Sequence, residues 1–322
     1  MEAMDFPSSA LALRVREDLG YLNWLYNPFQ RLTAAEIYEL LATRAATRRG
    51  LYLNLGYWEE AGDLDAASEA LARLIADRAQ IEAADTVLDV GFGFADQDIL
   101  WAESYRPARI IGLNISEPQV TLARRRVAER GLEERIDLRV GSATQMPIAA
   151  GSVDKVIALE CAFHFDTRER FFREAFRVLR PGGRLAVADI IPMAPAGGGV
   201  ERLEQLASWG FVASRFAIPE ANVYPRSSYR EILERRGYID VRVDSTRNKV
   251  YAPLHRYLAE HPTALERQHP LIRLSARAAL RLDPADLYGG LDYVLASATK
   301  PAATAEQQEE QASAATARRK SC

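Results

Sequence analysis

An alternation of short apolar runs with longer helical patterns, between about residues 66 and 190, constrains the fold of this chain most strongly. Helical stretches near 65–80, 97–104, 117–130 and 167–179 alternate with five strand-like runs, at 86–90, 109–113, 137–140, 153–159 and 184–191. Strands that alternate with helices form βαβ units, in which the strands pair in parallel within one sheet. The sequence therefore predicts an α/β fold with helices on both faces of a parallel sheet.

The flanking sequence adds helices and two more strands. A Leu-, Tyr- and Arg-rich helical segment spans roughly 9–48, and helical patterns recur at 199–216, 226–236 and twice within 253–282. Strand-like runs at 239–246 and 291–299 bring the total to seven. We predict a Rossmann-like, doubly wound, mostly parallel sheet with N-terminal helices and an inserted helical cap. The predicted divisions are a lid at 1–60, a core at 61–192, cap helices with the last strands at 193–300, and a tail at 301–322. The tail is predicted to be disordered because its Ala-, Glu- and Gln-rich composition cannot bury an apolar face.

Composition excludes several classes of function. The 41 Lys and Arg against 44 Asp and Glu give a net charge of -3, which offers no electrostatic reason to expect nucleic acid as a partner. The two cysteines, Cys161 and Cys322, do not form a disulfide framework. No apolar run is long enough to cross a bilayer, and the N-terminus lacks the pattern of a secretory signal. We therefore expect a cytoplasmic protein without integral membrane association. The sequence leaves open whether the chain forms a homo-oligomer.

A glycine-containing loop follows the first predicted strand. Gly91 and Gly93 let the backbone turn sharply and approach a ligand closely. The acidic Asp89 precedes them, and Ala95 stands where a dinucleotide fingerprint has its third glycine. An acidic residue at this place suits a ligand with a cationic amine better than a pyrophosphate. The next strand ends in Asn114, whose side chain can donate to and accept from ribose hydroxyls.

Four ordered motifs carry a family resemblance over about residues 86–191. VLDVGFGFAD, IIGLNISEPQ, VGSATQMPIAAGSVDKVIALECAFHF and AFRVLRPGGRLAVADII resemble the successive motifs of class I S-adenosylmethionine-dependent methyltransferases. The segment 52–58, YLNLGYW, is similar to a lid found in the branch that contains macrolide-sugar O-methyltransferases and sterol or isoprenyl-diphosphate C-methyltransferases. The resemblance implies S-adenosylmethionine as cofactor and methyl transfer as the reaction.

For the methionine half of the cofactor, the resemblance implies contacts from Asp89 and Gly91, with Gly93 in the same loop. Tyr57 would close over the carboxylate of the methionine, and Glu160 would begin the loop that faces the sulfonium.

For the nucleoside half, the resemblance implies that Asn114 and Gln119 hold the ribose and that Ile115 lies against the adenine. Ser142 and Ala143 would read the adenine amino edge. Three residues depart from the family pattern. Ala95 replaces a glycine, which requires a negative φ if the loop is to be unstrained. Asn114 and Ser142 replace acidic residues, so neutral hydrogen bonds would take the place of charge-assisted ones.

Candidate bases follow the fourth and fifth predicted strands. His164 is the first candidate, because a neutral imidazole can accept a hydroxyl proton and the resemblance places a proposed base of sugar O-methyltransferases here. Its flanking Phe163 and Phe165 equally suit a packed core histidine. Glu160 is either a cofactor contact or the carboxylate that assists C-methylation in prenyl-modifying relatives. Asp189 is either catalytic or structural, and Asp166 is predicted to cap the helix that follows.

The acceptor is predicted to be a small, largely apolar molecule, because the predicted cap is rich in aromatics such as Trp24, Phe29 and Trp209. No Mg²⁺ ligand set is recognisable, so no metal is expected. Five arginines are candidates for binding an anionic head group of the acceptor, such as a diphosphate: Arg14, Arg16, Arg31, Arg215 and Arg226. The sequence favours O-methylation of a natural-product hydroxyl, the alternatives being C-methylation of an isoprenoid or unsaturated lipid and a non-catalytic cofactor-binding module.

Overall fold

The computed structural model describes residues 10–42 and 46–302. Its centre is a seven-stranded sheet in the order β3-β2-β1-β4-β5-β7-β6. The strands are β1 (Thr86–Val90), β2 (Arg109–Asn114), β3 (Ile136–Val140), β4 (Val153–Leu159), β5 (Leu179–Pro192), β6 (Ile239–Ser245) and β7 (Leu291–Thr299). The first five pair in parallel, whereas β7 is antiparallel to both β5 and β6. The predicted Rossmann-like, seven-stranded, mostly parallel sheet is therefore confirmed.

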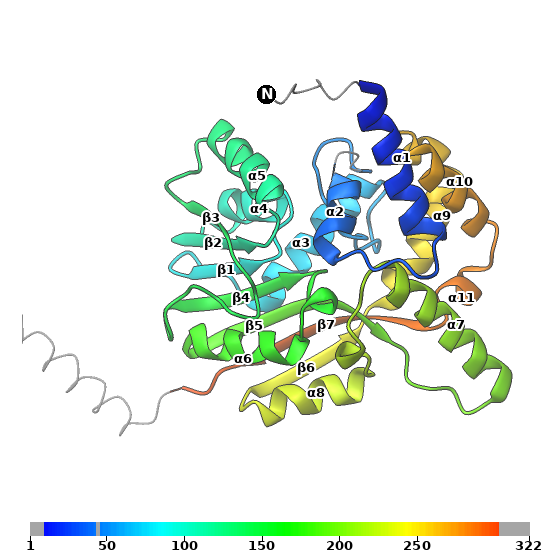
Figure 1. Ribbon diagram of the computed structural model, residues 1–322. Helices are drawn as coiled ribbons and strands as arrows, with labels where there is room; N and C mark the ends of the chain where they lie inside the picture. The colour runs from blue at the N-terminus through cyan, green and yellow to red at the C-terminus, as the bar shows by residue number, and fades with distance from the viewer. Residues whose placement is uncertain (1–9, 43–45, 303–322) are drawn as a thin grey trace, which may run out of the picture.

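Alternate residues of the strands enter two separate cores, one on each face of the sheet. Val87 of β1 belongs to a core with residues of α3, α4 and α5, and its neighbour Leu88 belongs to a core with residues of α6 and α8. Figure 1 shows α4 and α5 above the sheet and α6 and α8 below it. These helices are α3 (Leu64–Ala79), α4 (Asp96–Ser104), α5 (Glu117–Glu129), α6 (Arg168–Val178) and α8 (Arg226–Arg235). Burial on both faces explains why the central strands are almost continuously apolar.

Further helices form a cap near the carboxyl ends of the parallel strands, visible on the right of Figure 1. They are α1 (Ala10–Tyr26), α2 (Ala34–Ala42), α7 (Gly199–Arg215), α9 (Tyr251–Glu260), α10 (Pro270–Ala279) and α11 (Pro284–Leu287). Tyr21, Trp24 and Ile37 form a small core of their own, against which Phe216 packs. Among the described residues, no helix is long and apolar enough to cross a membrane.

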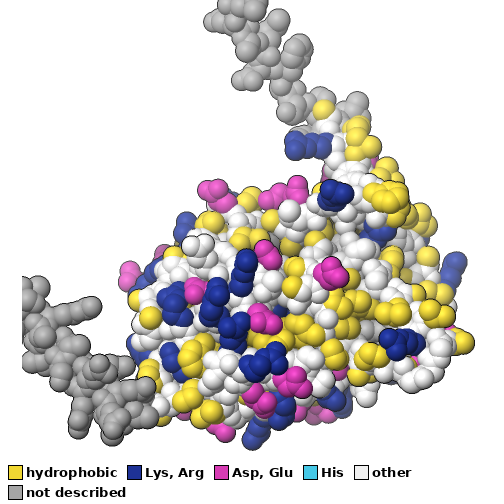
Figure 2. All heavy atoms as spheres, turned by 60° about the horizontal axis from the view of Figure 1, so that its bottom comes forward, with side chains coloured by type: hydrophobic (Ala, Val, Ile, Leu, Met, Phe, Trp, Pro, Cys, Tyr) yellow, Lys and Arg dark blue, Asp and Glu magenta, His cyan; other side chains and the backbone are white. Residues whose placement is uncertain are grey.

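The surface differs between these two parts of the molecule. In Figure 2, basic and acidic side chains are interspersed on the left of the face shown, and apolar side chains are more frequent on the right. Large apolar side chains with more than two-fifths of their surface exposed lie mainly on α1 and α7 and include Leu19, Leu22, Leu203, Leu206 and Phe211.

The structure corrects the sequence prediction in two local details. The strand predicted at 184–191 begins earlier, at Leu179, and residues 180–183 bulge out of the ladder between the pairs Val153–Leu179 and Lys155–Arg184. Thr167, and not Asp166, caps α6, since the Thr167 side chain accepts a hydrogen bond from the amide of Arg170. At the start of α5, Ser116 is the N-cap, although its side chain makes no capping bond.

The predicted division into lid, core and cap stays a prediction. Nearly all of the predicted tail, from residue 303 onward, lies outside the described residues.

Candidate functional site

A cavity of about 360 Å³ lies where the parallel strands β1 to β4 end. Such an edge of a doubly wound sheet is where ligands bind, because the loops there come from adjacent strands. Four groups of residues line it: the glycine loop after β1, the tips of β2 and β3, the segment after β4, and a cover made by 51–54 and the start of α2. The cavity is therefore built by the predicted sheet on one side and by the N-terminal part of the chain on the other.

The glycine loop has no room for side chains at its first glycine. Gly91 has a φ of +77°, and a Cβ there would lie 2.7 Å from Cys161. Gly93 has a φ of +57° and faces Leu53. An unstrained loop would require a negative φ at Ala95, but the φ of Ala95 is +64°. This left-handed residue closes a turn onto Phe92 and begins α4. The loop therefore keeps the geometry of a three-glycine loop, at a cost on the order of 1–2 kcal/mol for one alanine.

Asp89 lies directly behind this loop and does not itself line the cavity. It is fully buried, and its Oδ2 accepts a hydrogen bond of 3.0 Å from Gln97, which does line the cavity. Burial and the charge of the neighbouring Asp98 raise the pKa of Asp89. Its Oδ1 has no partner among the described residues. Asp89 is therefore linked to the cavity lining through Gln97.

Asn114 and Gln119 meet at the tip of β2, as the sequence predicted for the ribose end. Asn114 Nδ2 donates to Gln119 Oε1 at 2.8 Å, and Asn114 Oδ1 accepts from the amide of Ser116. Both side chains are buried, yet both line the cavity. Gln119 Nε2 has no partner among the described residues, so a buried donor is left over at this end. Ile115 lines the cavity beside them with 57% of its surface exposed.

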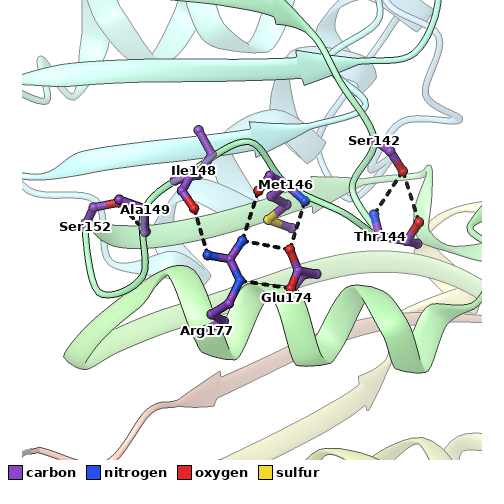
Figure 3. A network of polar contacts seen from close by, with 8 residues as sticks. All are labelled: Ser142, Thr144, Met146, Ile148, Ala149, Ser152, Glu174 and Arg177. Atoms are coloured by element: carbon purple, nitrogen blue, oxygen red, sulfur yellow. Dashed lines mark hydrogen bonds and ion pairs between the residues drawn. The ribbon is translucent and has the colours of Figure 1, made fainter.

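The loop after β3 carries Ser142, Ala143 and Thr144 into the cavity lining. Ser142 Oγ lies 3.0 Å from Thr144 Oγ1 and accepts from the Thr144 amide, which folds the loop into a compact turn. Figure 3 shows how the following residues are held on α6. Arg177 donates to the carbonyls of Met146 and Ile148 at 2.9 and 2.8 Å.

Glu174 completes this clamp. Its Oε2 accepts from the Met146 amide at 2.9 Å, and Arg177 bonds to both of its carboxylate oxygens. These hydrogen bonds lower the pKa of Glu174, so it stays ionised at neutral pH. The pair therefore ties the loop between β3 and β4 to α6 through three backbone groups.

Glu160 follows β4 with a φ of +52° and joins the two sides of the cavity. Its carboxylate accepts from the amide of Leu55, at 2.9 and 3.1 Å, and from the hydroxyl of Tyr293, at 2.6 Å. Burial raises its pKa to about 7, although these hydrogen bonds oppose the shift. A carboxyl with such a pKa is poised to change protonation near neutrality, which is typical of functional sites.

His164 lines the cavity and lies within hydrogen-bond distance of Tyr38 from α2. Its Nε2 is 3.1 Å from the hydroxyl of Tyr38, and the two rings meet edge to face. Burial lowers the pKa of His164 to about 3, a shift that the backbone of Phe216 opposes. The imidazole is therefore neutral throughout the physiological range.

Besides Asp89, two predicted site residues do not line the cavity, Tyr57 and Asp189. Tyr57 does not line the cavity, because its backbone is tied to Ala67 and its hydroxyl donates to Glu59. The cover comes instead from Leu51, Leu53 and Asn54 of the same segment.

Asp189 is fully buried and pairs with Arg168, whose Nε is 2.8 Å away, and with the hydroxyl of Tyr229. It is not among the residues that line the cavity, so this arrangement favours its structural reading.

The face of α2 toward the cavity was not found from the sequence. Thr33, Ala34, Ala35 and Tyr38 line the cavity, whereas the predicted aromatic walls do not. Trp24 packs inside the cap and Phe29 is exposed. The spacing of these α2 residues places them on one helical face, but the same spacing is typical of any amphipathic helix.

The Asp, Glu, Lys and Arg side chains that line the cavity are all acidic. Glu160 and Asp166 line the cavity, and neither Lys nor Arg does. None of the five arginines considered for an anionic head group reaches it, and Arg215 instead donates to the carbonyls of Trp24 and Asn27. Within the described part of the chain, no three His, Cys, Asp or Glu side chains are grouped to hold a metal ion.

Comparison with known proteins agrees with this geometry. Residues 88–187 match a family described as a methyltransferase domain. Erythromycin 3''-O-methyltransferase of Saccharopolyspora erythraea is 37% identical over 273 residues, which are 83% of this chain and 89% of that protein. The 27-O-demethylrifamycin SV methyltransferase of Amycolatopsis mediterranei is 35% identical over 153 residues, 47% of this chain and 56% of its own.

Solved structures show the same fold at low identity. A geranyl diphosphate methyltransferase in complex with S-adenosylmethionine superposes with a TM-score of 0.62 at 19% identity, covering 78% of this chain and all of that one. The [4+2]-cyclase SpnF gives 0.62 at 22% identity, covering 84% and 98%. The chain belongs to the class I S-adenosylmethionine-dependent methyltransferases that act on small molecules, and its cofactor is S-adenosylmethionine.

The residues present fit this cofactor. The backbone at Gly91 leaves no room for a Cβ, so a ligand can approach it closely. The unpaired Nε2 donor of Gln119 suits a ribose hydroxyl. A lining with acidic side chains but neither Lys nor Arg suits a cationic sulfonium. We propose that the loop from Gly91 holds the methionine half, with Asp89 acting through Gln97. Asn114 and Gln119 would hold the ribose, and Ile115, Ser142 and Ala143 the adenine.

Proposed function

We propose that this enzyme methylates a hydroxyl oxygen of a small, largely apolar natural product, such as a glycosylated polyketide, with His164 receiving the hydroxyl proton. The observation that carries the proposal is the position of His164, a neutral base that lines the cavity together with the glycine loop and Glu160. Similarity to an erythromycin 3''-O-methyltransferase over most of the chain supports an oxygen acceptor on a sugar.

The one-sided charge of the lining supports an uncharged acceptor. A diphosphate is bound by Arg or Lys side chains or through a divalent cation. Neither Arg nor Lys lines the cavity, and the described residues group no three His, Cys, Asp or Glu side chains that could hold a metal ion. This observation weighs against an isoprenyl diphosphate, although relatives of the same fold act on one. The net charge of -3 likewise supports a small molecule in preference to a nucleic acid.

When bound, S-adenosylmethionine supplies an electrophilic methyl group, so the protein has to position the acceptor and remove one proton. The low pKa of His164 keeps one ring nitrogen free of a proton before reaction. A hydroxyl becomes strongly acidic as its oxygen is alkylated, and a weak base then suffices. Glu160 anchors the cover through Leu55, which fixes the 51–54 segment over the cavity.

The test is a screen of macrolide and other glycosylated acceptors with methyl-labelled cofactor, comparing His164→Ala with Glu160→Gln. The proposal predicts an oxygen-methylated product and a loss of about 100-fold or more in kcat for His164→Ala. Glu160→Gln keeps the size of the side chain and tests C-methylation, in which that carboxylate would assist the reaction. Undiminished turnover of His164→Ala would overturn the base assignment, and a carbon-methylated product would overturn the reaction class.

A further inference from the structure

Tyr38 occupies one ring nitrogen of His164. Its hydroxyl lies 3.1 Å from Nε2, and both side chains line the cavity. Nδ1 is buried and makes no hydrogen bond of normal geometry with the described residues. Because Nδ1 is buried, an acceptor hydroxyl that approaches the ring has to come to Nε2, where it meets Tyr38.

The direction of this hydrogen bond depends on the tautomer of His164. A neutral imidazole carries one N–H, and the other nitrogen accepts. A relay through this pair needs the Tyr38 phenol to donate to Nε2, so the single ring proton has to lie on Nδ1. The Tyr38 phenol then donates to Nε2, and burial first, followed by Glu160 and Cys161, raises its pKa so that it keeps its proton.

The position of Tyr38 is set by a capped helix. The Thr33 hydroxyl accepts from the Glu36 amide, and the Glu36 carboxylate accepts from the Thr33 amide at 2.8 Å. This reciprocal pair is a capping box, which fixes the first turn of α2. The turn that follows presents Tyr38 to His164, and the edge-to-face contact of the rings, at 5.2 Å between centroids, restricts both.

We propose that Tyr38 is a catalytic residue that contacts the acceptor hydroxyl and relays its proton to His164, an inference that rests on the function proposed above. The acceptor O–H bond breaks and its proton passes to Tyr38 Oη, while the original phenolic proton passes from Oη to His164 Nε2. Tyr38 ends the step as a phenol, and His164 ends it protonated on both nitrogens. No other oxidant, reductant or co-reactant takes part in this proton transfer.

Kinetics of Tyr38→Phe test the relay, because the variant keeps the ring and removes only the hydroxyl. We expect kcat to fall about 100-fold with an unchanged KM for the cofactor. In the double variant with His164→Ala, we expect no further loss beyond the larger single effect, since residues of one relay act as a unit. The matched control is Tyr26→Phe, whose hydroxyl contacts Ser275 at an exposed site, and its activity should equal that of the wild type.

The tautomer of His164 gives a readout that does not depend on turnover. In ¹⁵N NMR of the full chain without ligands, with the His164→Ala spectrum to assign the signal, we expect the proton on Nδ1. A proton on Nε2 would overturn the relay, because Tyr38 would then accept from the ring. Full kcat in Tyr38→Phe alongside a loss in His164→Ala would also overturn the relay while leaving the proposed function standing. Full kcat in both variants would overturn both.

Discussion

The two sides of the cavity are held in place by different means. On the sheet side, backbone turns, glycines and the Glu174–Arg177 clamp fix the lining at several points. On the cap side, α2 lines the cavity with two alanines and contributes the Tyr38 hydroxyl as its contact with His164. The cap also has its own small core and an exposed apolar surface on α1 and α7.

This difference fits the two tasks of such an enzyme. The cofactor is the same in every relative, so its side needs many rigid, specific contacts. The acceptor differs between relatives, and side chains on helices outside the sheet can change without disturbing the strands. The contacts between the two sides are then the places where a substitution should have the most effect.

The largest effect is expected at Asp189, where sheet and cap are joined. Its partner Arg168 is fully buried and donates to the carbonyl of Asn222, which follows α7. Asp189→Ala leaves a buried guanidinium unpaired and should lower the free energy of unfolding by about 3–5 kcal/mol. Denaturant unfolding measures this change. Asp244→Ala, which removes a partner exposed on the surface, is the control and should cost under about 1 kcal/mol. A stable Asp189→Ala protein without activity would instead indicate a catalytic role.

The second effect is expected within the glycine loop. Gly91→Ala would force a Cβ to within 2.7 Å of Cys161 at a φ of +77°. We expect cofactor affinity to fall about 100-fold, or roughly 3 kcal/mol, as the loop shifts out of place. Gly151→Ala is a matched control, because Gly151 also has a positive φ but meets nothing within 4 Å. Calorimetric titration with S-adenosylhomocysteine compares the two, and equal affinities would show that the loop tolerates the displacement.

The smallest effect is expected from the clamp, which acts on the cavity at a distance. Arg177→Ala frees the carbonyls of Met146 and Ile148 and loosens the turn that carries Ser142. We expect cofactor affinity to fall about tenfold while kcat at saturation changes less than twofold. Arg235→Ala breaks an exposed pair with Glu231 on α8 and serves as control. An unchanged dissociation constant in Arg177→Ala would mean that the turn holds its shape alone.

The same division decides what could be predicted from the sequence. Periodicity placed all seven strands, and β1, β4 and β7 begin and end where predicted. These strands are largely buried, so each is marked in the sequence by a largely apolar run. Asn114 and Gln119 were predicted to act together, and the structure brings them into contact. Local motifs suffice at this end, since each loop takes its place from the strand that precedes it.

The cap side could not be predicted in the same way. Tyr38 and His164 are 126 residues apart, and no local pattern says that α2 packs over that loop. Tyr57 was expected at the cavity because its segment was correctly identified, but the tie of its backbone to Ala67 turns the neighbouring Leu53 and Asn54 inward instead. The left-handed Ala95 was missed because a strained residue is selected by its surroundings and not by its own propensity.

The position of β7 also has a consequence for synthesis of the chain. β7 lies between β5 and β6, although it is the last strand in the sequence. While the chain emerges from the ribosome, β1 to β5 can pair in turn, but β5 keeps an open edge and β6 has no strand beside it until residues 291–299 appear. Until then, the Glu160 carboxylate also lacks the hydrogen bond that the hydroxyl of Tyr293 donates to it. A nascent chain that stalls before this point carries a nearly finished cofactor loop on an unfinished sheet, and such an intermediate exposes a strand edge that favours aggregation and binding by chaperones.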